Sequence, residues 1–358
     1  MRKLNVCVLF GGVSPEHEVS LRSAESVLNH LDPEKYDIFP VGITKEGNWI
    51  LYGGTDYSLL PDNEWLQCAG NRRVAISPVH GQGLLVFEGD GVLREHIDVV
   101  FPVLHGENGE DGTVQGLLQM AGIPYVGCHV AASAACMDKC LTKLMAAQAE
   151  VRQADWELVT RLQLRTAPEA ALDRVERRFT YPVFVKPAGT GSSVGVSKAR
   201  GREALLAALE NAARYDSKVL VEEFISGREV EVAVLGNELP VASVPGEIDA
   251  GAEFYDYDTK YITDTSTLYI PARISETAAE QVRQSAVRIY QAMGCRGLAR
   301  VDFFVTFEGE QVVFNEINTM PGFTSISMYP KLFCASGIPY GELLDRLVTL
   351  ALEAQNEI

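Results

Sequence analysis

Hydrophobic residues in the first third of the chain follow two patterns. Short continuous apolar runs, typical of buried parallel strands, alternate with apolar residues at helical spacing. The runs predict strands at 4–10, 37–43, 49–51, 98–104 and 123–127, and the spacings predict helices at 19–31 and 113–121. A strand, a glycine turn and a helix in succession are the elements of an α/β fold. We therefore expect an open, mostly parallel α/β domain over residues 1–136, with a Gly-, Pro-, Asn- and Ser-rich insertion at 53–83.

The remaining two thirds of the chain predict two further units. After a helix at 132–148, the middle of the chain predicts a strand, a glycine-rich loop, a helix and a strand at 181–187, 188–195, 202–214 and 219–223. The last part predicts strands at 229–235 and 240–247, a helix at 275–293, a β-hairpin at about 301–318, a polar loop and a final helix at 341–353. We expect a central α+β domain at 137–225 and a third domain at 226–358.

The predicted hairpin carries three oxygen-bearing side chains. Apolar runs at 301–305 and 313–318 are separated by a polar turn that contains a glycine. Side chains alternate faces along a strand, so Glu316 and Asn318 share one face, and Asp302 is expected on the strand opposite. Carboxylate and amide oxygens suit Mg²⁺, which usually accompanies phosphates. The hairpin therefore predicts a magnesium site; the alternative is a solvated acidic face.

A second group of candidate residues follows the strand at 181–187. Lys186 ends that strand, and the loop 188–195 contains three glycines, so backbone N–H groups can bind phosphate oxygens beside a positive charge. The loop is not a Walker A sequence, and a flexible linker is the alternative. Glu222 and Glu229 flank a short loop at a spacing that suits the adenine and the ribose of a nucleotide; surface acids are the alternative.

Other single residues occupy positions that suit an α/β ligand site. Glu16 follows the first strand and His105 follows a later apolar strand, where open α/β sheets bind ligands. A hydrogen-bonded structural histidine is the alternative for His105. Arg300 lies beside the hairpin acids and can stabilise charge on a phosphoryl group, and Gly322 can present an unhindered N–H. The tyrosine-rich loop 249–267 predicts a lid, or an aromatic patch packed on the core.

Composition excludes several classes of protein. The chain has 358 residues, and 47% hydrophobic and 22% charged residues are ordinary for a globular protein. A net charge of −17 argues against nucleic-acid binding. No apolar run reaches the roughly 18 residues that a membrane helix needs, and Met1-Arg2-Lys3-Leu4 is expected to open a strand rather than a signal peptide. Seven cysteines without a C-x-x-C pair indicate reduced thiols in the cytoplasm and argue against zinc.

Sequence motifs follow one another in a family-specific order. They are Phe10-Gly11-Gly12, the segment 14–20, Leu104-His105-Gly106 with 109–112, Met137-Asp138-Lys139, Val185-Lys186-Pro187, 191–195, 254–257, Lys260-Tyr261, Arg300-Val301-Asp302, 315–318 and 321–325. Together they closely resemble the motifs of D-alanine–D-alanine ligases of the ATP-grasp superfamily, and the match covers essentially the full length. The resemblance implies a three-domain ATP-grasp fold, usually a homodimer, with ATP and Mg²⁺ between the central and C-terminal domains.

The resemblance also implies roles for individual residues. Implied ATP contacts are Lys139, Lys186, Ser193, Glu222 (adenine), Phe224, Ile225, Glu229 (ribose) and Lys260 (γ-phosphate). Two Mg²⁺ ions, or Mn²⁺ instead, are implied at Asp302, Glu316 and Asn318. The implied catalytic residues are Glu16 on the first D-alanine's ammonium, with Ser192 and Tyr261 as its partners, and Arg300 with the Gly322 N–H on the tetrahedral oxyanion. The implied substrate contacts are His105, Tyr255 and, for the second D-alanine's carboxylate, Ser327 with the Met328 backbone.

The activity implied by the resemblance is ATP-dependent synthesis of D-alanyl-D-alanine through an acyl phosphate, for peptidoglycan precursors in the cytoplasm. ATP, D-alanine and a second copy of the chain are the expected partners; nucleic acid and membrane are not. Lys260-Tyr261 argues against D-lactate as second substrate, whereas a D-alanine–D-serine ligase of the glycopeptide-resistance type stays open. A catalytically silent binding protein and another ATP-grasp ligase are the remaining alternatives, but the acids and lysines of the family are all retained.

Two positions depart from the family pattern. Gly189-Thr190 stands where a charged or polar pair is common. The loop that is expected to cover the phosphates could therefore be less firmly anchored than in the family. Ile326 stands where a His or Tyr is frequent, beside the second substrate. The second-substrate preference is therefore the least determined part of the expected function.

Overall fold

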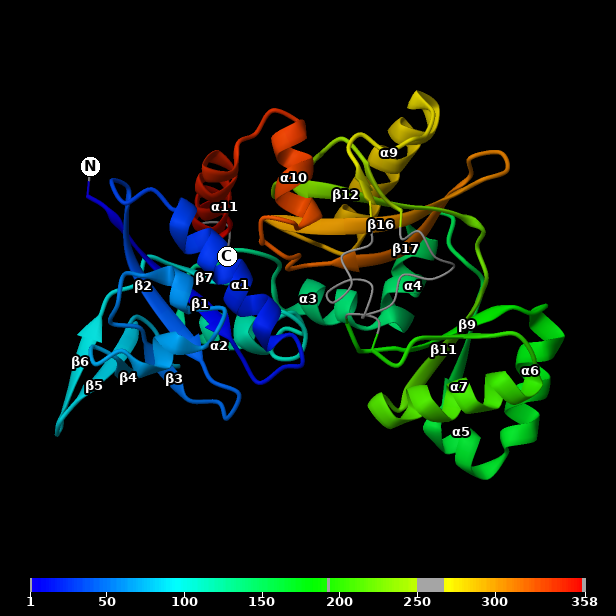
Figure 1. Cartoon of the computed structure of the whole chain (residues 1–358), viewed down its shortest axis with the longest axis horizontal. Helices are drawn as coiled ribbons and strands as arrows, with labels where there is room; N and C mark the ends of the chain where they lie inside the picture. The colour runs from blue at the N-terminus through cyan, green and yellow to red at the C-terminus, as the bar shows by residue number, and fades with distance from the viewer. Residues whose placement is uncertain (1, 192–193, 250–266, 356–358) are drawn as a thin grey trace.

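The computed structural model describes residues 2–191, 194–249 and 267–355, and these residues form three β-sheets (Figure 1). Each sheet lies within one of the three predicted domains. The division into domains itself stays a prediction, because helices from one segment also cover the sheet of another.

The first sheet combines a parallel centre with an antiparallel extension, in the order β6-β5-β4-β3-β2-β1-β7. Its strands are β1 (Leu4–Gly11), β2 (Tyr36–Ile43), β3 (Trp49–Leu51), β4 (Arg72–Ile76), β5 (Leu84–Glu88), β6 (Gly91–Glu95) and β7 (Val99–Pro102). β1 pairs in parallel with β2 and β7, whereas β2 to β6 pair antiparallel. The α/β fold is confirmed, but the expectation of a mostly parallel sheet is wrong. Parallel pairing needs a long crossover, and the short connections β4–β5–β6 permit only hairpins.

Helices cover both faces of this sheet because β1 is apolar on both sides. Val6, Val8 and Phe10 pack with α1 (His17–His30) and with the C-terminal helix α11 (Tyr340–Gln355). Cys7 and Leu9 pack on the opposite side with α2 (Thr113–Ala121). The C-terminal helix therefore completes the core of the N-terminal sheet, as the neighbouring blue and red elements in Figure 1 show.

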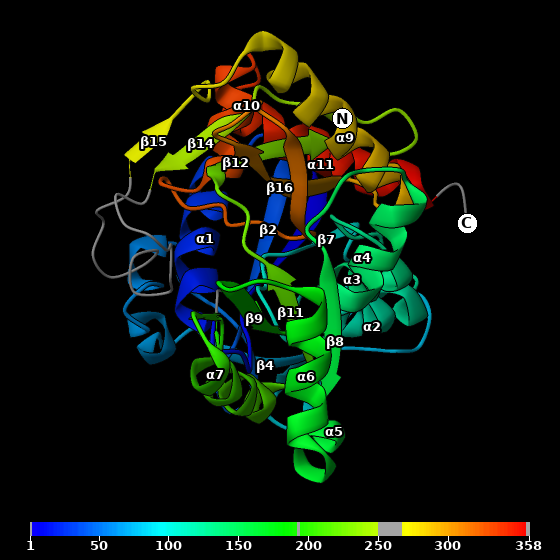
Figure 2. The ribbon, with the colours of Figure 1, turned by 90° about the vertical axis from the view of Figure 1, so that its right-hand side faces the viewer.

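The second sheet is small and wholly antiparallel, in the order β10-β9-β11-β8. Its strands are β8 (Trp156–Thr160), β9 (Val183–Pro187), β10 (Ser197–Ala199) and β11 (Lys218–Glu223). The helices α5 (Arg161–Thr166), α6 (Pro168–Arg178) and α7 (Arg202–Tyr215) accompany it, and Figure 2 shows them at the end of the molecule opposite α9 (Glu276–Ala292). Lys186 lies on β9 and Glu222 on the adjacent β11, so this sheet carries two of the predicted nucleotide residues.

The third sheet has the order β15-β14-β12-β16-β17, with β13 paired to β12. Its strands are β12 (Gly227–Leu235), β13 (Val241–Ala242), β14 (Gly246–Asp249), β15 (Thr267–Tyr269), β16 (Leu298–Thr306) and β17 (Val312–Asn318). Alternate residues of β12 face opposite cores: Val230 and Val232 pack with α9, whereas Ala233 and Leu235 share a core with α10 (Met328–Ala335). The predicted hairpin is thus confirmed as β16–β17.

Four local expectations are wrong. The strand predicted at 240–247 is two short strands, β13 and β14, which pair with β12 at separate places. The helix predicted at 132–148 is two helices, α3 (Val130–Met137) and α4 (Lys139–Gln148), because Asp138 is extended and its side chain caps α4 by accepting from Cys140 N at 2.9 Å. The strand predicted at 123–127 contributes a single bridge. The polar loop expected after the hairpin contains α10, although its apolar residues Met328, Tyr329, Leu332 and Phe333 do recur at helical spacing. No helix within the described ranges is both long and apolar enough to cross a membrane.

Candidate active site

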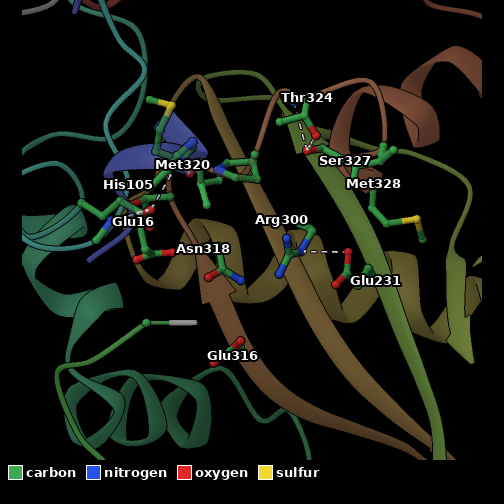
Figure 3. A pocket seen from close by; sticks show the side chains of 18 of the residues that line it. Glu16, His105, Glu231, Arg300, Glu316, Asn318, Met320, Thr324, Ser327 and Met328 are labelled. Atoms are coloured by element: carbon green, nitrogen blue, oxygen red, sulfur yellow. Dashed lines mark hydrogen bonds and ion pairs between the residues drawn. The ribbon is translucent and has the colours of Figure 1, made fainter. Parts of the chain in front are cut away.

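A cavity of about 990 Å³ lies between α1, with the loops after β1 and β7, and the third sheet (Figure 3). Its walls come from α1, from the loops after β1 and β7, from β17 and from α10. Of the predicted site residues, it brings together Glu16, His105, Lys139, Arg300, Glu316, Asn318, Gly322, Ser327 and Met328. Residues predicted from widely separated parts of the sequence therefore line the same cavity.

Other predicted residues are elsewhere. Ser192, Ser193, Tyr255, Lys260 and Tyr261 lie outside the described residues, as does most of the candidate lid at 249–267. The nucleotide candidates Glu222, Phe224, Ile225 and Glu229 are on or beside β11 and β12 and do not line the cavity. Their roles stay predictions.

Glu16 reaches the cavity from the loop between β1 and α1. The Ser14 hydroxyl ties this loop to the loop after β7, because it donates to His105 O at 2.9 Å and accepts from Glu16 N at 3.1 Å. Two glycines leave room for the Glu16 carboxylate. A Cβ atom on Gly106, which has φ +69°, would overlap Glu16 Oε2, and one on Gly191 would lie 2.9 Å from the same oxygen. Glu16 therefore stands between the N-terminal domain and the phosphate loop.

The hairpin brings its three oxygen-bearing side chains together. Asp302 is paired with Glu316, and Arg300 with Asn318, in the register of β16 and β17. Asn318 Nδ2 donates to Asp302 Oδ2 at 3.1 Å. Turning the Asn318 amide over would present its oxygen instead, since the two orientations are not distinguished by shape. Among the described residues no three His, Cys, Asp or Glu side chains form a metal site, so this carboxylate–amide set is the candidate, and its hard oxygens fit Mg²⁺.

Arg300 is clamped between two carboxylates. Its Nε and Nη2 atoms donate to the two Asp302 oxygens at 2.8 and 2.7 Å, and Nε lies 3.0 Å from Glu231 Oε2 (Figure 3). Burial alone would lower the pKa of Arg300, but Asp302 and Glu231 outweigh it and raise the pKa well above its ordinary range. Arg300 is therefore a permanent, oriented cation at the cavity wall. Glu231 was missed by sequence reasoning, because only the pairing of β12 with β16 brings it opposite Asp302.

The loop 188–195, called the phosphate loop after its predicted role, is anchored at several points in its described part. Lys139 Nζ donates to Thr190 O at 2.7 Å, and Gly189 N donates to Asp216 Oδ2 at 2.7 Å. The Thr190 hydroxyl donates to Val194 O at 3.2 Å and closes the loop on itself. Gly189-Thr190 therefore does not leave this part of the loop unanchored.

Behind the phosphate loop, Glu222 is held by two lysines. Its Oε1 atom lies 2.6 Å from Lys143 Nζ, and its Oε2 atom lies 2.6 Å from Lys186 Nζ, which also donates to Asn315 Oδ1 at 3.1 Å. Burial would raise the pKa of Glu222, but the two ammonium groups outweigh it and lower the pKa to about 2. Lys143, from α4, was not predicted; its sequence neighbourhood contains no signal of a buried charge.

Phe224 and Glu229 lie near this cluster. Lys198 Nζ stands 4.1 Å from the centre of the Phe224 ring, which also stacks near Phe184 at a centroid distance of 6.0 Å. Burial would lower the pKa of Lys186, but nearby carboxylates outweigh it and raise the pKa. Glu222 is the largest of these causes, and Glu229 also contributes. The predicted phosphate, adenine and ribose residues are therefore neighbours on the second and third sheets.

His105 has both ring nitrogens committed within the protein. Nδ1 donates to Met320 O at 2.9 Å, and Nε2 shares a hydrogen bond of 3.1 Å with the Ser23 hydroxyl. Burial would lower the pKa of His105, but the Glu110 carboxylate, 3.7 Å from Nδ1, and the Glu16 carboxylate outweigh it and raise the pKa. His105 therefore has the hydrogen bonds of a structural histidine, which was the alternative, and it also lines the cavity.

The N-terminus of α10 faces the cavity. Ser327 precedes the helix, and its hydroxyl accepts from Thr324 N at 3.0 Å instead of capping α10. The first N–H groups of α10, beginning at Met328, are therefore not capped by that side chain. Helix N-termini with uncapped N–H groups are suited to bind carboxylates. This geometry supports the predicted place of a substrate carboxylate.

Comparison with known proteins identifies the relatives of this chain. Residues 5–128 match the family model described as "D-ala D-ala ligase N-terminus", and residues 145–349 match "D-ala D-ala ligase C-terminus". A D-alanine–D-alanine ligase of Caldicellulosiruptor bescii is 50% identical, over 100% of this chain and 97% of that protein. Another, from Acetivibrio thermocellus, is 52% identical over 99% of this chain and 97% of that protein.

Solved structures with the same fold include two kinds of ligase. The VanG D-Ala:D-Ser ligase from Enterococcus faecalis has a TM-score of 0.89 and 40% identity, over 98% of this chain and 100% of that chain. The D-alanine-D-alanine ligase from Coxiella burnetii has a TM-score of 0.86 and 37% identity, over 100% of this chain and 96% of that chain. The ATP-grasp fold expected from the motifs is thereby confirmed.

Proposed function

The chain belongs to the D-alanine–D-alanine ligase family, and we propose that it joins two D-alanine molecules to D-alanyl-D-alanine with conversion of ATP to ADP and phosphate. The observation that carries this proposal is the single cavity in which a carboxylate, a permanent guanidinium, a glycine N–H and a helix N-terminus meet beside a pair of hairpin acids. Each of these groups suits a different part of two amino acids and a phosphate.

The reaction has two steps. A carboxylate oxygen of the first D-alanine attacks the γ-phosphorus of ATP, the bond to ADP breaks, and an acyl phosphate forms. The free amine of the second D-alanine then attacks the acyl carbon, phosphate leaves, and the nitrogen releases a proton. The protein contributes mainly positioning and charge neutralisation, and it must exclude water that would hydrolyse the acyl phosphate.

The first D-alanine is proposed to lie between Glu16 and Arg300. Glu16 binds its ammonium, and Ser192 and Tyr261 are the hydrogen-bonded partners of the Glu16 carboxylate. Arg300 and the Gly322 N–H stabilise the oxyanion that forms when the amine attacks. The ion pairs with Asp302 and Glu231 support this role, because they hold the guanidinium in place before substrate arrives.

The second D-alanine is proposed to bind at α10. Ser327 and the Met328 N–H take its carboxylate at the positive end of the helix dipole. His105 is proposed to lie near the reacting carboxylate of the first D-alanine, and Tyr255 completes the substrate site. Ser327, Met328, Arg300 and Gly322 all line the same cavity, so a D-alanine bound at α10 shares it with the proposed oxyanion donors.

ATP is proposed to bind over the second and third sheets. Lys139, Lys186, Ser193 and Lys260 contact the phosphates; Glu222, Phe224 and Ile225 contact adenine, and Glu229 contacts ribose. The anchored loop and the cluster around Glu222 support this arrangement. Asp302, Glu316 and Asn318 would hold two Mg²⁺ ions, or Mn²⁺, which would neutralise phosphate charge. A homodimer in the cytoplasm that supplies peptidoglycan precursors completes the proposal.

A D-alanine–D-serine ligase is the second candidate, favoured by the likeness to the VanG enzyme. The two reactions differ by one hydroxyl on the second substrate, so only pocket shape discriminates them. The test is ADP release by the purified protein with ATP, Mg²⁺ and D-alanine, alone and with D-serine or D-lactate. We expect a higher kcat/KM for D-alanine than for D-serine as second substrate. The reverse order would overturn the proposal, and no D-amino-acid-dependent release would indicate a silent binding protein.

A further inference from the structure

The loop between β17 and α10 is held by side chains from distant parts of the chain. His105 Nδ1 donates to Met320 O at 2.9 Å, and Phe323 N donates to Ser23 Oγ at 3.2 Å. On the far side, the Tyr340 hydroxyl donates to Phe323 O at 2.7 Å. The peptide groups on both sides of Pro321-Gly322 are therefore fixed by α1, by the loop after β7 and by α11.

Gly322 lies between these anchored residues. It lines the cavity, and among the described residues its N–H has no hydrogen-bond acceptor. A Cβ atom at this position would lie 2.7 Å from Ser327 Oγ, so a larger residue would displace the start of α10. The direction of the Gly322 N–H is therefore set by its anchored neighbours and not by a bond of its own.

Ser23 connects two of these anchors through one oxygen atom. It lies on the buried face of α1 and is wholly inaccessible to solvent. Its hydroxyl oxygen accepts from Phe323 N and is hydrogen-bonded to His105 Nε2 at 3.1 Å. Ser23 therefore joins His105, which is hydrogen-bonded to Met320 O, and the N–H of Phe323 into one network. A buried network of this kind is rigid when all of its members are satisfied.

We propose that Ser23 is a positioning residue for the ligase reaction, which orients the Gly322 N–H toward the oxyanion by holding Phe323 and His105. The inference rests on the proposed function and assigns Ser23 no contact with substrate. Without the hydroxyl, the Phe323 N–H and His105 Nε2 lose their shared partner in a site that water does not reach. The loop then relaxes, and the Gly322 N–H no longer meets the oxyanion at hydrogen-bond distance.

The expected effect falls on the chemical step. A misplaced oxyanion donor costs roughly 10²-fold in rate, so Ser23→Ala should lower kcat by about 10- to 100-fold. The KM values for ATP and for the first D-alanine should stay near those of the wild type, because Glu16 and the nucleotide residues are untouched. A tetrahedral phosphinate analogue of D-alanyl-D-alanine should lose affinity in parallel with kcat, whereas binding of the first D-alanine at Glu16 should not.

The control is Ser243→Ala. Ser243 is equally buried and also accepts a backbone N–H, from Ala233 at 3.0 Å, but it lies outside the cavity. Ser243→Ala should lower thermal stability and leave kcat and the affinity for the phosphinate unchanged. Ser23→Cys, which keeps the volume but accepts weakly, is the second variant and should show a smaller loss of kcat than Ser23→Ala.

The outcomes separate the inference from the function on which it rests. Normal kcat and normal phosphinate affinity in a folded Ser23→Ala or Ser23→Cys protein would overturn the role of Ser23 while the ligase activity stands. A loss of kcat equal to that of Ser243→Ala would overturn it as well, because a general loss of stability would then explain both. Absence of D-alanine-dependent ADP release by the wild-type protein would overturn the proposed function itself.

Discussion

Replacement of Lys143 by methionine tests the buried ion cluster behind the phosphate loop. Lys143 Nζ lies 2.6 Å from Glu222 Oε1, and the two side chains are only 3% and 5% exposed. Methionine keeps most of the length and apolar volume of lysine but carries no charge. The change therefore removes one of the two cations that hold Glu222 ionised, and leaves Lys186 as its remaining partner.

The magnitude follows from the pKa of Glu222. Burial raises it, but the two lysines outweigh burial and lower it from an ordinary 4.5 to about 2, which corresponds to about 3 to 4 kcal/mol for both lysines together at about 1.4 kcal/mol per pKa unit. Loss of one partner from a buried ion pair costs roughly 3–5 kcal/mol. We expect Lys143→Met to lose about 3 kcal/mol of unfolding free energy at pH 7. Because the folded-state pKa is lowered, the contribution is complete above about pH 4.5 and is lost as pH falls toward about 2.

The assay is urea unfolding followed by tryptophan fluorescence, at pH 7 and at several values between pH 4.5 and the acid limit of folding. The wild-type and Lys143→Met curves should be well separated at pH 7 and should approach each other as pH falls. ATP affinity, measured by calorimetry, should also drop, because Glu222 would hold Lys186 more tightly and draw it away from its proposed contact with the phosphates.

Two controls sharpen this prediction. Lys35→Met breaks an exposed ion pair with Asp345 and should change little. The double variant Lys143→Met/Glu222→Gln removes the charge on both partners and should be more stable than Lys143→Met alone, because no carboxylate is left with a single partner. Equal unfolding midpoints for Lys143→Met and the wild type at pH 7 would refute the reasoning.

Two further outcomes can be checked in the same assays. Asp302→Asn or Glu316→Gln should abolish D-alanine-dependent ADP release in a protein that still folds, because each removes an anionic oxygen from the proposed metal site. Near-normal turnover in both variants would show that the hairpin acids do not take part in the reaction. Gly106→Ala should raise the KM for the first D-alanine about 10-fold or more, because the added Cβ overlaps the Glu16 carboxylate at a backbone φ of +69°; an unchanged KM would argue against Glu16 as the ammonium site.

Local patterns in the sequence were sufficient for much of the fold. The strand and helix of the first α/β unit, the helix α9 and the hairpin β16–β17 follow from apolar spacing over 7 to 17 consecutive residues. The pairing of Asp302 with Glu316 depends on a β-bulge between Asp302 and Phe303 that the sequence did not show. The register nearer the turn, from Phe303–Phe314 to Val305–Val312, follows as well, because a short turn fixes it. These features depend on neighbours along the chain, which a sequence displays directly.

Motifs located Glu16, His105, Arg300 and the hairpin acids, but they did not show which groups hold those residues in place. Glu231 is opposite Asp302 only because β12 pairs with β16, and Lys143 meets Glu222 only because α4 packs behind β11. The break at Asp138 also went unpredicted, because apolar spacing continues through it.

The chain alone thus determined which residue types could do the chemistry, since carboxylates, lysines and glycines have their properties wherever they stand. Their distances, their pKa values and their supporting contacts were decided by the tertiary structure. Ser23 and Phe323 are 300 residues apart in sequence and share a hydrogen bond in the fold. Such a contact leaves no local pattern, because it depends on how α1, the first sheet and the loop before α10 pack together.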